Sequence, residues 1–201
     1  MAWLNLACFM ECTEAEGPGR RFAIWTQGCL LRCAECCNQQ FQPLRPAHII
    51  SSDELFNRIC TSREENNIEG ITLLGGEPFL QAAGLAQVAR RTQEAGLSVM
   101  CFTGYDYSWL KSRCDFKGTR ELLEHIDVLV DGPYLRNKSE QVRNWVGSTN
   151  QNFIYLTDFY TSEIETRPQI VSCEWRIGAD GSITVNGYPA DIPLSAPPDQ
   201  S

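Results

Sequence analysis

Cys29-Leu-Leu-Arg-Cys33-Ala-Glu-Cys36 places three cysteines within eight residues, and no other part of the chain says more about it. Three thiolates so close in sequence can converge on one soft metal centre. Structural zinc requires four protein ligands, whereas a [4Fe–4S] cluster held by three cysteines keeps one iron open for a substrate or cofactor. The same spacing also suits a zinc site completed by Cys37 or by a distant Cys or His, or a redox-active thiol pair. Cys29, Cys33 and Cys36 are therefore candidate metal ligands.

Length and composition are those of a globular protein of one domain. The 201 residues are 43% hydrophobic and 21% charged, and the net charge is −8. Such an acidic chain does not favour binding to a nucleic-acid backbone, which needs clustered Lys and Arg. No apolar run approaches the roughly 20 residues of a membrane span, and the N-terminus does not resemble a signal peptide. Ten cysteines without an export signal indicate a reducing compartment. We expect a cytoplasmic protein that binds neither nucleic acid nor a membrane.

Strand-like apolar runs alternate with helical patterns along most of the chain. Helices are expected over residues 52–61, 79–95 and within 107–125. The expected strands are Phe22 to Thr26, Gly70 to Leu74, Ser98 to Thr103 and Asp127 to Val130. Strands separated by helices predict βαβ units and a parallel sheet. A complete eight-unit barrel needs about 250 residues, so this chain predicts an open, incomplete (β/α) barrel of four to six strands.

The pattern changes near the C-terminus. Residues 176–188 predict a small antiparallel hairpin that turns at Asp180-Gly181. The last dozen residues, rich in Pro and Ser, predict a loose tail.

A second motif, Gly75-Gly76-Glu77-Pro78, begins 39 residues after Cys36. It follows a predicted strand, at the edge of a parallel sheet where active sites collect. Two glycines let the backbone come close to a ligand, Glu77 adds a carboxylate, and Pro78 suits the first turn of a helix. The alternative is a plain strand-to-helix turn whose Glu caps the helix.

Together, the cysteine triplet and the Gly-Gly-Glu-Pro segment resemble the radical S-adenosylmethionine superfamily. The resemblance implies that Cys29, Cys33 and Cys36 hold one [4Fe–4S] cluster whose open iron chelates the amino and carboxylate groups of S-adenosylmethionine. It further implies that Gly75, Gly76 and Glu77 help to hold the cofactor. In that superfamily an electron from the cluster cleaves the cofactor to methionine and a 5′-deoxyadenosyl radical, which abstracts hydrogen from a substrate.

Within the superfamily, residues 3–157 resemble the activating proteins of anaerobic ribonucleotide reductase. The segments that carry this resemblance are Glu16–Arg20, Thr26–Gly28, Asn38, Phe102–Tyr105, Val130–Tyr134 and Gly147–Gln151. The resemblance implies a glycyl-radical enzyme as partner and an electron donor such as flavodoxin or ferredoxin. We accordingly divide the chain into a radical S-adenosylmethionine core domain, residues 1–157, and a C-terminal extension, residues 158–201.

Some positions depart from the superfamily pattern or leave alternatives open. Glu35 stands where many members carry an aromatic residue facing the adenine. Cys37 neighbours the triplet, and we expect it not to be a ligand because adjacent side chains point apart. Asp131 contacts the cofactor ribose or a cation, or simply forms a turn. The candidate cofactor-binding residues are thus Glu35, Cys36, Cys37, Gly75, Gly76, Glu77 and Asp131.

We expect no catalytic side chain of the protein's own, because the cofactor carries the chemistry. Two other functions remain open at this stage. One is a radical enzyme that modifies a peptide or small molecule directly. The other is a non-catalytic, metal-binding regulator.

Overall fold

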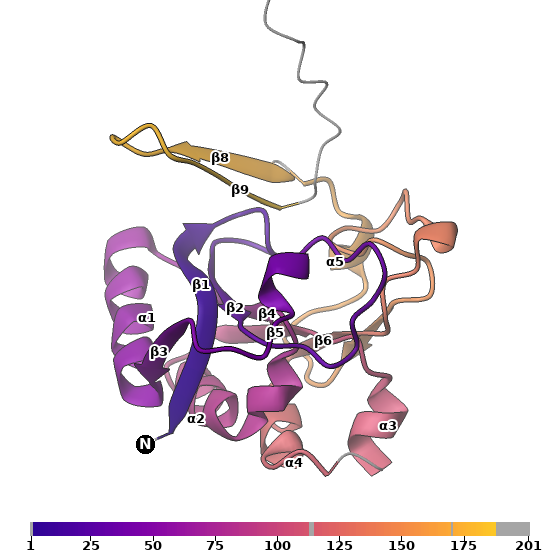
Figure 1. The fold of residues 1–201 in the computed structure, drawn as a ribbon. Coiled ribbons are helices and arrows are strands. Elements are labelled where there is room, and N and C mark those ends of the chain that lie inside the picture. Colours follow the sequence, from indigo (N-terminus) through magenta and orange to yellow (C-terminus); the bar gives the residue numbers. More distant parts are fainter. Residues whose placement is uncertain (1, 113–114, 170, 188–201) are drawn as a thin grey trace, which may run out of the picture.

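A seven-stranded mixed sheet forms the centre of the computed structural model, which describes residues 2–112, 115–169 and 171–187 (Figure 1). The strands lie in the order β3-β1-β2-β4-β5-β6-β7. They are β1 Trp3–Thr13, β2 Arg21–Thr26, β3 His48–Ser51, β4 Gly70–Gly75, β5 Ser98–Phe102, β6 Val128–Asp131 and β7 Asn152–Tyr155. The helices are α1 Ser52–Asn66, α2 Ala82–Glu94, α3 Tyr107–Ser112, α4 Thr119–Leu123 and α5 Glu163–Thr166, with short 3-10 helices η1 Gln39–Phe41, η2 Pro78–Gln81 and η3 Arg136–Lys138.

Strands β2, β4, β5 and β6 run parallel to one another. They correspond to the four strands predicted from the sequence, so the α/β class with a mainly parallel sheet is confirmed. Around this parallel core, β1 pairs antiparallel with both β2 and β3, and β7 pairs antiparallel with β6. The sheet therefore has one strand more than the four to six expected, and it stays open among the described residues because its end strands β3 and β7 do not pair.

The two faces of the sheet are covered differently. Phe22 and Ile24 of β2 belong to the main apolar core, which includes residues of α1, α2 and α4. Ala23 and Trp25 alternate with them and pack with Leu74 on the opposite face. Loops pack against that face. Gly17, in the loop between β1 and β2, lies so close to the sheet that a Cβ on it would be 3.1 Å from the Thr72 side chain and 3.2 Å from that of Met100. Helices thus cover one face, and loops close over the other.

Local signals explain where the two long helices begin. The Ser51 side chain accepts a hydrogen bond from the Glu54 amide and caps α1. This helix continues to Asn66, five residues past the predicted end, and stops where Asn67 adopts a left-handed conformation. The predicted helix 79–95 starts instead as η2, with Pro78 in its first turn, and continues as α2.

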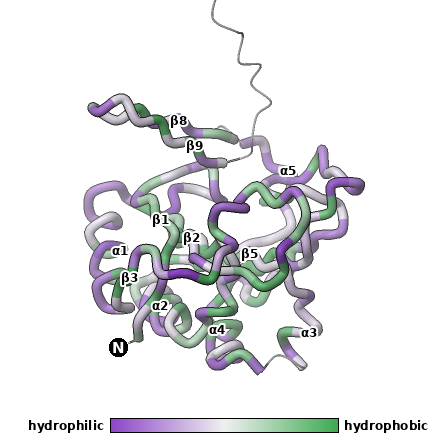
Figure 2. Tube along the Cα trace, viewed as in Figure 1, coloured by the Kyte–Doolittle hydropathy of each residue, from purple (hydrophilic) through white to green (hydrophobic). Residues whose placement is uncertain are grey.

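The predicted C-terminal hairpin is confirmed as β8 Cys173–Ile177 paired with β9 Ile183–Gly187. Its strands alternate in polarity, as the green and purple bands of Figure 2 show. The polar side faces the rest of the molecule, where Arg176 donates to the Cys12 carbonyl and Asn186 to the Thr13 hydroxyl. On the other side Trp175 and Val185 form one exposed pair and Ile177 and Ile183 another. Residue 188 and the predicted loose tail lie outside the described residues.

Among the helices of the described ranges, none combines the length and the apolar character needed to cross a bilayer.

Candidate functional site

The cysteine loop, residues 28–38, leaves the sheet at the carboxyl end of β2. It has no regular structure and returns against η1, where the Gly28 amide donates to the Phe41 carbonyl at 2.7 Å. Cys29 is buried, Cys33 and Cys36 are half-buried, and Cys37 is exposed. All four are free thiols.

The three thiols of the triplet lie close enough to affect one another. Burial raises the pKa of Cys33, and the charges of Cys36 and Cys29 raise it further. Nevertheless, in the described part of the chain no three His, Cys, Asp or Glu side chains already stand as a metal ion would require. The three cysteines therefore lie on one loop, but their side chains are not arranged around a common metal position. Three free thiols on a short irregular loop are a donor set that fits an iron–sulfur cluster.

The side chains of Cys36 and Cys37 interact, so they do not point apart as expected, and the exclusion of Cys37 from the ligands stays a prediction. Its thiol and that of Cys36 are hydrogen-bonded, and this bond is the main cause that lowers the pKa of Cys36 to about 6. The same bond raises the pKa of Cys37. The Asn38 amide also donates to the Cys36 sulfur, at 3.4 Å. Adjacent side chains diverge in a strand, but the cysteine loop is not a strand.

The glycine pair at the end of β4, Gly75 and Gly76, packs directly against the base of the cysteine loop. The Gly76 amide donates to the Thr26 carbonyl at 2.8 Å, and the Glu77 amide donates to the Gly28 carbonyl at 2.9 Å. A Cβ on Gly76 would lie 2.3 Å from the Gly28 oxygen, and Gly75 has a φ of 111°. Only glycine lets these two backbones meet.

The Glu77 carboxylate is buried and bonded to protein donors. Its Oε1 accepts from the Phe79 amide at 3.0 Å and from the Thr103 hydroxyl at 2.9 Å, while Oε2 accepts from the Gly104 amide at 3.0 Å. Burial raises the pKa of Glu77 to about 7, against the effect of these donors. Glu77 thus caps η2, as the plain-turn alternative predicts, and also joins β4 to the end of β5. A contact with the cofactor stays a prediction.

Asp131 and Glu35 occupy contrasting surroundings. Asp131 is buried at the end of β6, where its carboxylate accepts from the Tyr107 amide at 2.7 Å and from the Asn152 side chain at 2.9 Å. Glu35 has a left-handed backbone, with φ 62°, and forms an ion pair with Arg136. The pair spans an open cavity of about 640 Å³, lined by residues 33–35 on one side and 133–137 on the other.

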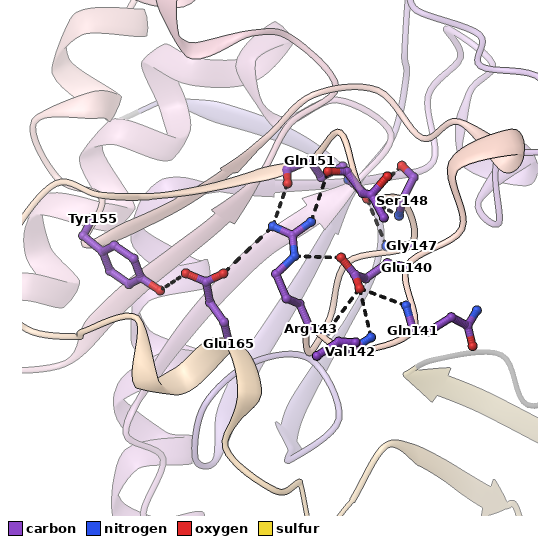
Figure 3. Close-up of polar contacts among 10 residues, drawn as sticks. Glu140, Gln141, Val142, Arg143, Gly147, Ser148, Gln151, Tyr155 and Glu165 are labelled. Atoms are coloured by element: carbon purple, nitrogen blue, oxygen red, sulfur yellow. Dashed lines mark hydrogen bonds and ion pairs between the residues drawn. The ribbon is translucent and has the colours of Figure 1, made fainter.

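Sequence reasoning missed Arg136 and also the role of residues 147–151, which contributed only to the family resemblance. Figure 3 shows that this loop is tied to the Arg143 guanidinium and, through it, to Glu140. The sequence indicated such a network only in that residues 147–151 are mostly polar and show neither a helical nor a strand pattern. Arg136 carried no signal, because its partner Glu35 is 101 residues away.

Comparisons with known proteins agree with this site. A family model described as a 4Fe-4S single cluster domain matches residues 15–154. The anaerobic ribonucleoside-triphosphate reductase-activating protein of Vibrio cholerae is 30% identical over 154 residues, 74% of this chain and 96% of that protein. Its counterpart from Enterobacteria phage T4 is 28% identical over 77% of this chain and 96% of its own length. The pyruvate formate-lyase 1-activating enzyme of Escherichia coli is 28% identical over 77% of this chain and 61% of that enzyme. A solved structure, QueE from Escherichia coli, has a TM-score of 0.42 and 16% identity over 51% of this chain and 53% of its own.

The family model and the curated relatives define the class as radical S-adenosylmethionine enzymes of the oxidoreductase type. Within that class, the chain belongs to the 4Fe-4S single cluster domain family and is close to the anaerobic ribonucleotide reductase activating proteins. Its cofactors are accordingly a [4Fe–4S] cluster and S-adenosylmethionine. The resemblance seen in the sequence is therefore confirmed at the level of the family.

Proposed function

We propose that this protein activates a partner enzyme by generating a radical on a glycine of that partner, and that the partner is an anaerobic ribonucleotide reductase. The observation that carries the proposal is the similarity to two activating proteins of that reductase over 96% of their length. The open edge of the sheet supports it, since a large partner can present its own loop there.

Cys29, Cys33 and Cys36 are the proposed ligands of the cluster. Cys29 is buried and Cys33 and Cys36 are half-buried on one loop, which suits a cluster that must be reached by both an electron donor and a cofactor. Cys37 is a fourth thiol next to these three, and we propose that it is not a ligand. When bound, the cluster supplies the electron that cleaves S-adenosylmethionine.

The proposed cofactor site is the carboxyl edge of β2, β4 and β6. The floor of this site is formed by Gly75, Gly76 and Glu77. Its sides are formed by Glu35 and Asp131. Glu77 and Asp131 are bonded to protein donors, and the Gly76 and Glu77 amides already donate to Thr26 and Gly28. We therefore assign the contacts with the methionine end to the backbone carbonyls around Gly76 first. The chain's part is to orient the sulfonium and to exclude water.

We also propose that residues 1–157 form the core and 158–201 the extension. The family match ends at residue 154, one residue before the end of β7, which supports this division. The hairpin in the extension is not needed for the core activity.

Anaerobic reconstitution tests the function. Protein reconstituted with iron and sulfide is incubated with S-adenosylmethionine and a strong reductant, and 5′-deoxyadenosine is measured. We expect slow cleavage by the protein alone, and an organic glycyl radical in electron paramagnetic resonance when the reductase is added. Fast consumption of a peptide or small molecule, with no radical on the reductase, would instead show a direct modifying enzyme. Zinc without iron or sulfide would show a metal-binding regulator.

A further inference from the structure

Residues 132–137, here called the facing wall, lie opposite the cysteine loop across the open cavity. Pro133 to Asn137 line one side of the cavity, and Cys33 to Glu35 line the other. Arg136 reaches across and pairs with Glu35. Apart from the start of η3 at Arg136, the facing wall has no regular structure. Its position must therefore be set by contacts with other parts of the chain.

A second loop, residues 147–151, supplies those contacts. Each of three side chains in it holds a different backbone group of the facing wall. The Leu135 amide donates to Ser148 Oγ at 3.1 Å, Asn150 Nδ2 donates to the Pro133 carbonyl at 2.8 Å, and Gln151 Nε2 donates to the Gly132 carbonyl at 3.4 Å. Ser148 is fully buried. The facing wall is thus held at three points, Gly132, Pro133 and Leu135, by side chains of one loop.

That loop is itself held by hydrogen bonds, which Figure 3 draws as dashed lines. Gln151 Oε1 accepts from the Gly147 and Ser148 amides at 3.0 and 3.1 Å. Arg143 donates to the carbonyls of Gln151, at 2.9 Å, and of Thr149, at 3.4 Å. The other edge of its guanidinium donates to the Glu140 carboxylate at 2.7 Å. A loop fixed in this way can hold an irregular segment in one place.

We propose that Ser148 and Gln151 are positioning residues that keep the facing wall against the cysteine loop and thereby set the reduction potential of the cluster. The proposal deepens the proposed function, because it requires Cys33 to be a cluster ligand. Among the described residues, neither side chain has a hydrogen bond to a cysteine of the triplet, and both bond to the facing wall or within their own loop. They act through residues 132–137, which limit the access of water to the Cys33 side of the loop.

The direction of the effect follows from charge. Reduction adds one electron to the cluster, so the reduced state carries the larger negative charge. Water stabilises the more highly charged state, and solvent exposure is one of the factors that set the potential of such clusters. Loosening the facing wall therefore raises the midpoint potential.

Two variants loosen the facing wall by different means. Ser148→Ala removes the acceptor of the Leu135 amide. Gln151→Glu keeps the oxygen that accepts within the loop but replaces the Nε2 donor to Gly132. The added negative charge of the Glu would by itself lower the potential. An upward shift in both variants would therefore come from loosening of the facing wall and not from the direct electrostatic effect of the new charge. Val142→Ala is the matched control, because Val142 is 72% exposed in the neighbouring segment.

The readouts are hydrogen exchange of amides 132–137 in protein without a cluster, and a potentiometric titration of reconstituted protein. We expect about tenfold faster exchange, the loss typical of one hydrogen bond, and a raised midpoint potential at unchanged iron and sulfide content. The control should change neither quantity. Exchange that stays slow in both variants overturns the positioning role, and faster exchange with an unchanged potential overturns the link to the cluster. If the wild-type protein assembles no cluster on its triplet, the proposed function fails first, and that result is visible before any variant is compared.

Discussion

The cysteine loop and the Gly-Gly-Glu-Pro turn lie against each other, yet they use their polar groups in opposite ways. In the turn, the Glu77 carboxylate is buried and accepts from three protein donors. In the loop, Cys36 has its neighbour Cys37 and the Asn38 amide as partners, and both Cys33 and Cys36 are only half-buried. The turn is already complete without a ligand, whereas the loop is not. We conclude that the turn adopts its structure without a ligand and positions the cysteine loop that packs against it.

The largest effect is expected from the loop. Replacing Cys29, Cys33 or Cys36 by Ala should abolish the cluster and all cleavage of S-adenosylmethionine, because two thiolates do not hold it firmly. Iron and sulfide analysis after anaerobic reconstitution measures this loss, with Cys8→Ala as a thiol control outside the loop. A Cys36→Ala protein that kept its full iron content would overturn our ligand assignment.

The second prediction tests whether the turn positions the cysteine loop. Gly76→Ala should lower the free energy of unfolding by about 2 kcal/mol or more, because its Cβ meets the Gly28 carbonyl. Gly96→Ala is the control, since a Cβ there has nothing within 4 Å and only its φ of 78° is strained. Denaturant unfolding and the alkylation rate of buried Cys29 measure the two variants. If Gly76→Ala were as stable as wild type and bound S-adenosylmethionine more weakly, the glycine would serve the ligand alone.

A smaller effect concerns the charge of the turn. The pKa of Glu77 is raised by burial to about 7 from an ordinary 4.5. The folded state therefore holds a proton that the unfolded state releases between these values, so stability falls as pH rises from 4.5 to 7. The loss attributable to Glu77 is about 3 kcal/mol. Unfolding measured from pH 5 to pH 8 should show this slope.

Glu77→Gln should flatten that slope while lowering stability at pH 5, because its amide nitrogen faces the Gly104 donor. Glu16 contributes in the same direction, since burial raises its pKa to about 7 as well. Glu16→Gln therefore serves as the matched comparison. An unaltered slope in the Glu77 variant would mean that Glu77 is ionised in the fold at all these pH values.

The smallest effect is expected at Cys37. Cys37→Ala should leave iron and sulfide content nearly intact after reconstitution, because the proposed ligands remain. It removes the hydrogen bond to Cys36, but a cluster would take over that sulfur. Loss of most of the iron in this variant would place Cys37 among the ligands.

The parallel core of the fold and the position of both motifs were accessible from the sequence. Apolar runs such as Gly70 to Leu74 are buried on both sides and stand out as strands. The antiparallel additions did not stand out. β1 is interrupted by irregularities between Leu6 and Cys8 and again after Met10, and β3 and β7 have only four residues each. Their pairing is set by tertiary contacts and not by a period in the sequence.

For the site, the sequence indicated which residues gather but not what they bond. The carboxyl ends of β2, β4 and β6 bring Cys29, Glu77 and Asp131 to one edge, as parallel pairing requires. Hydrogen bonds such as that from Gly104 to Glu77 join positions 27 residues apart. Bonds of this kind depend on loop conformations that no local pattern encodes, so the saturation of Glu77 was not foreseeable.

The C-terminal hairpin has a consequence for how this protein could have diverged from its relatives. It lies beyond the matched residues 15–154, and the contacts from Arg176 and Asn186 to the core are hydrogen bonds. The exposed pair of Trp175 and Val185 contributes nothing to the core's packing. An appendage fastened through polar contacts can be gained or lost in a lineage without any change in the buried residues. Selection on its outward face is therefore uncoupled from selection on the enzyme beneath it.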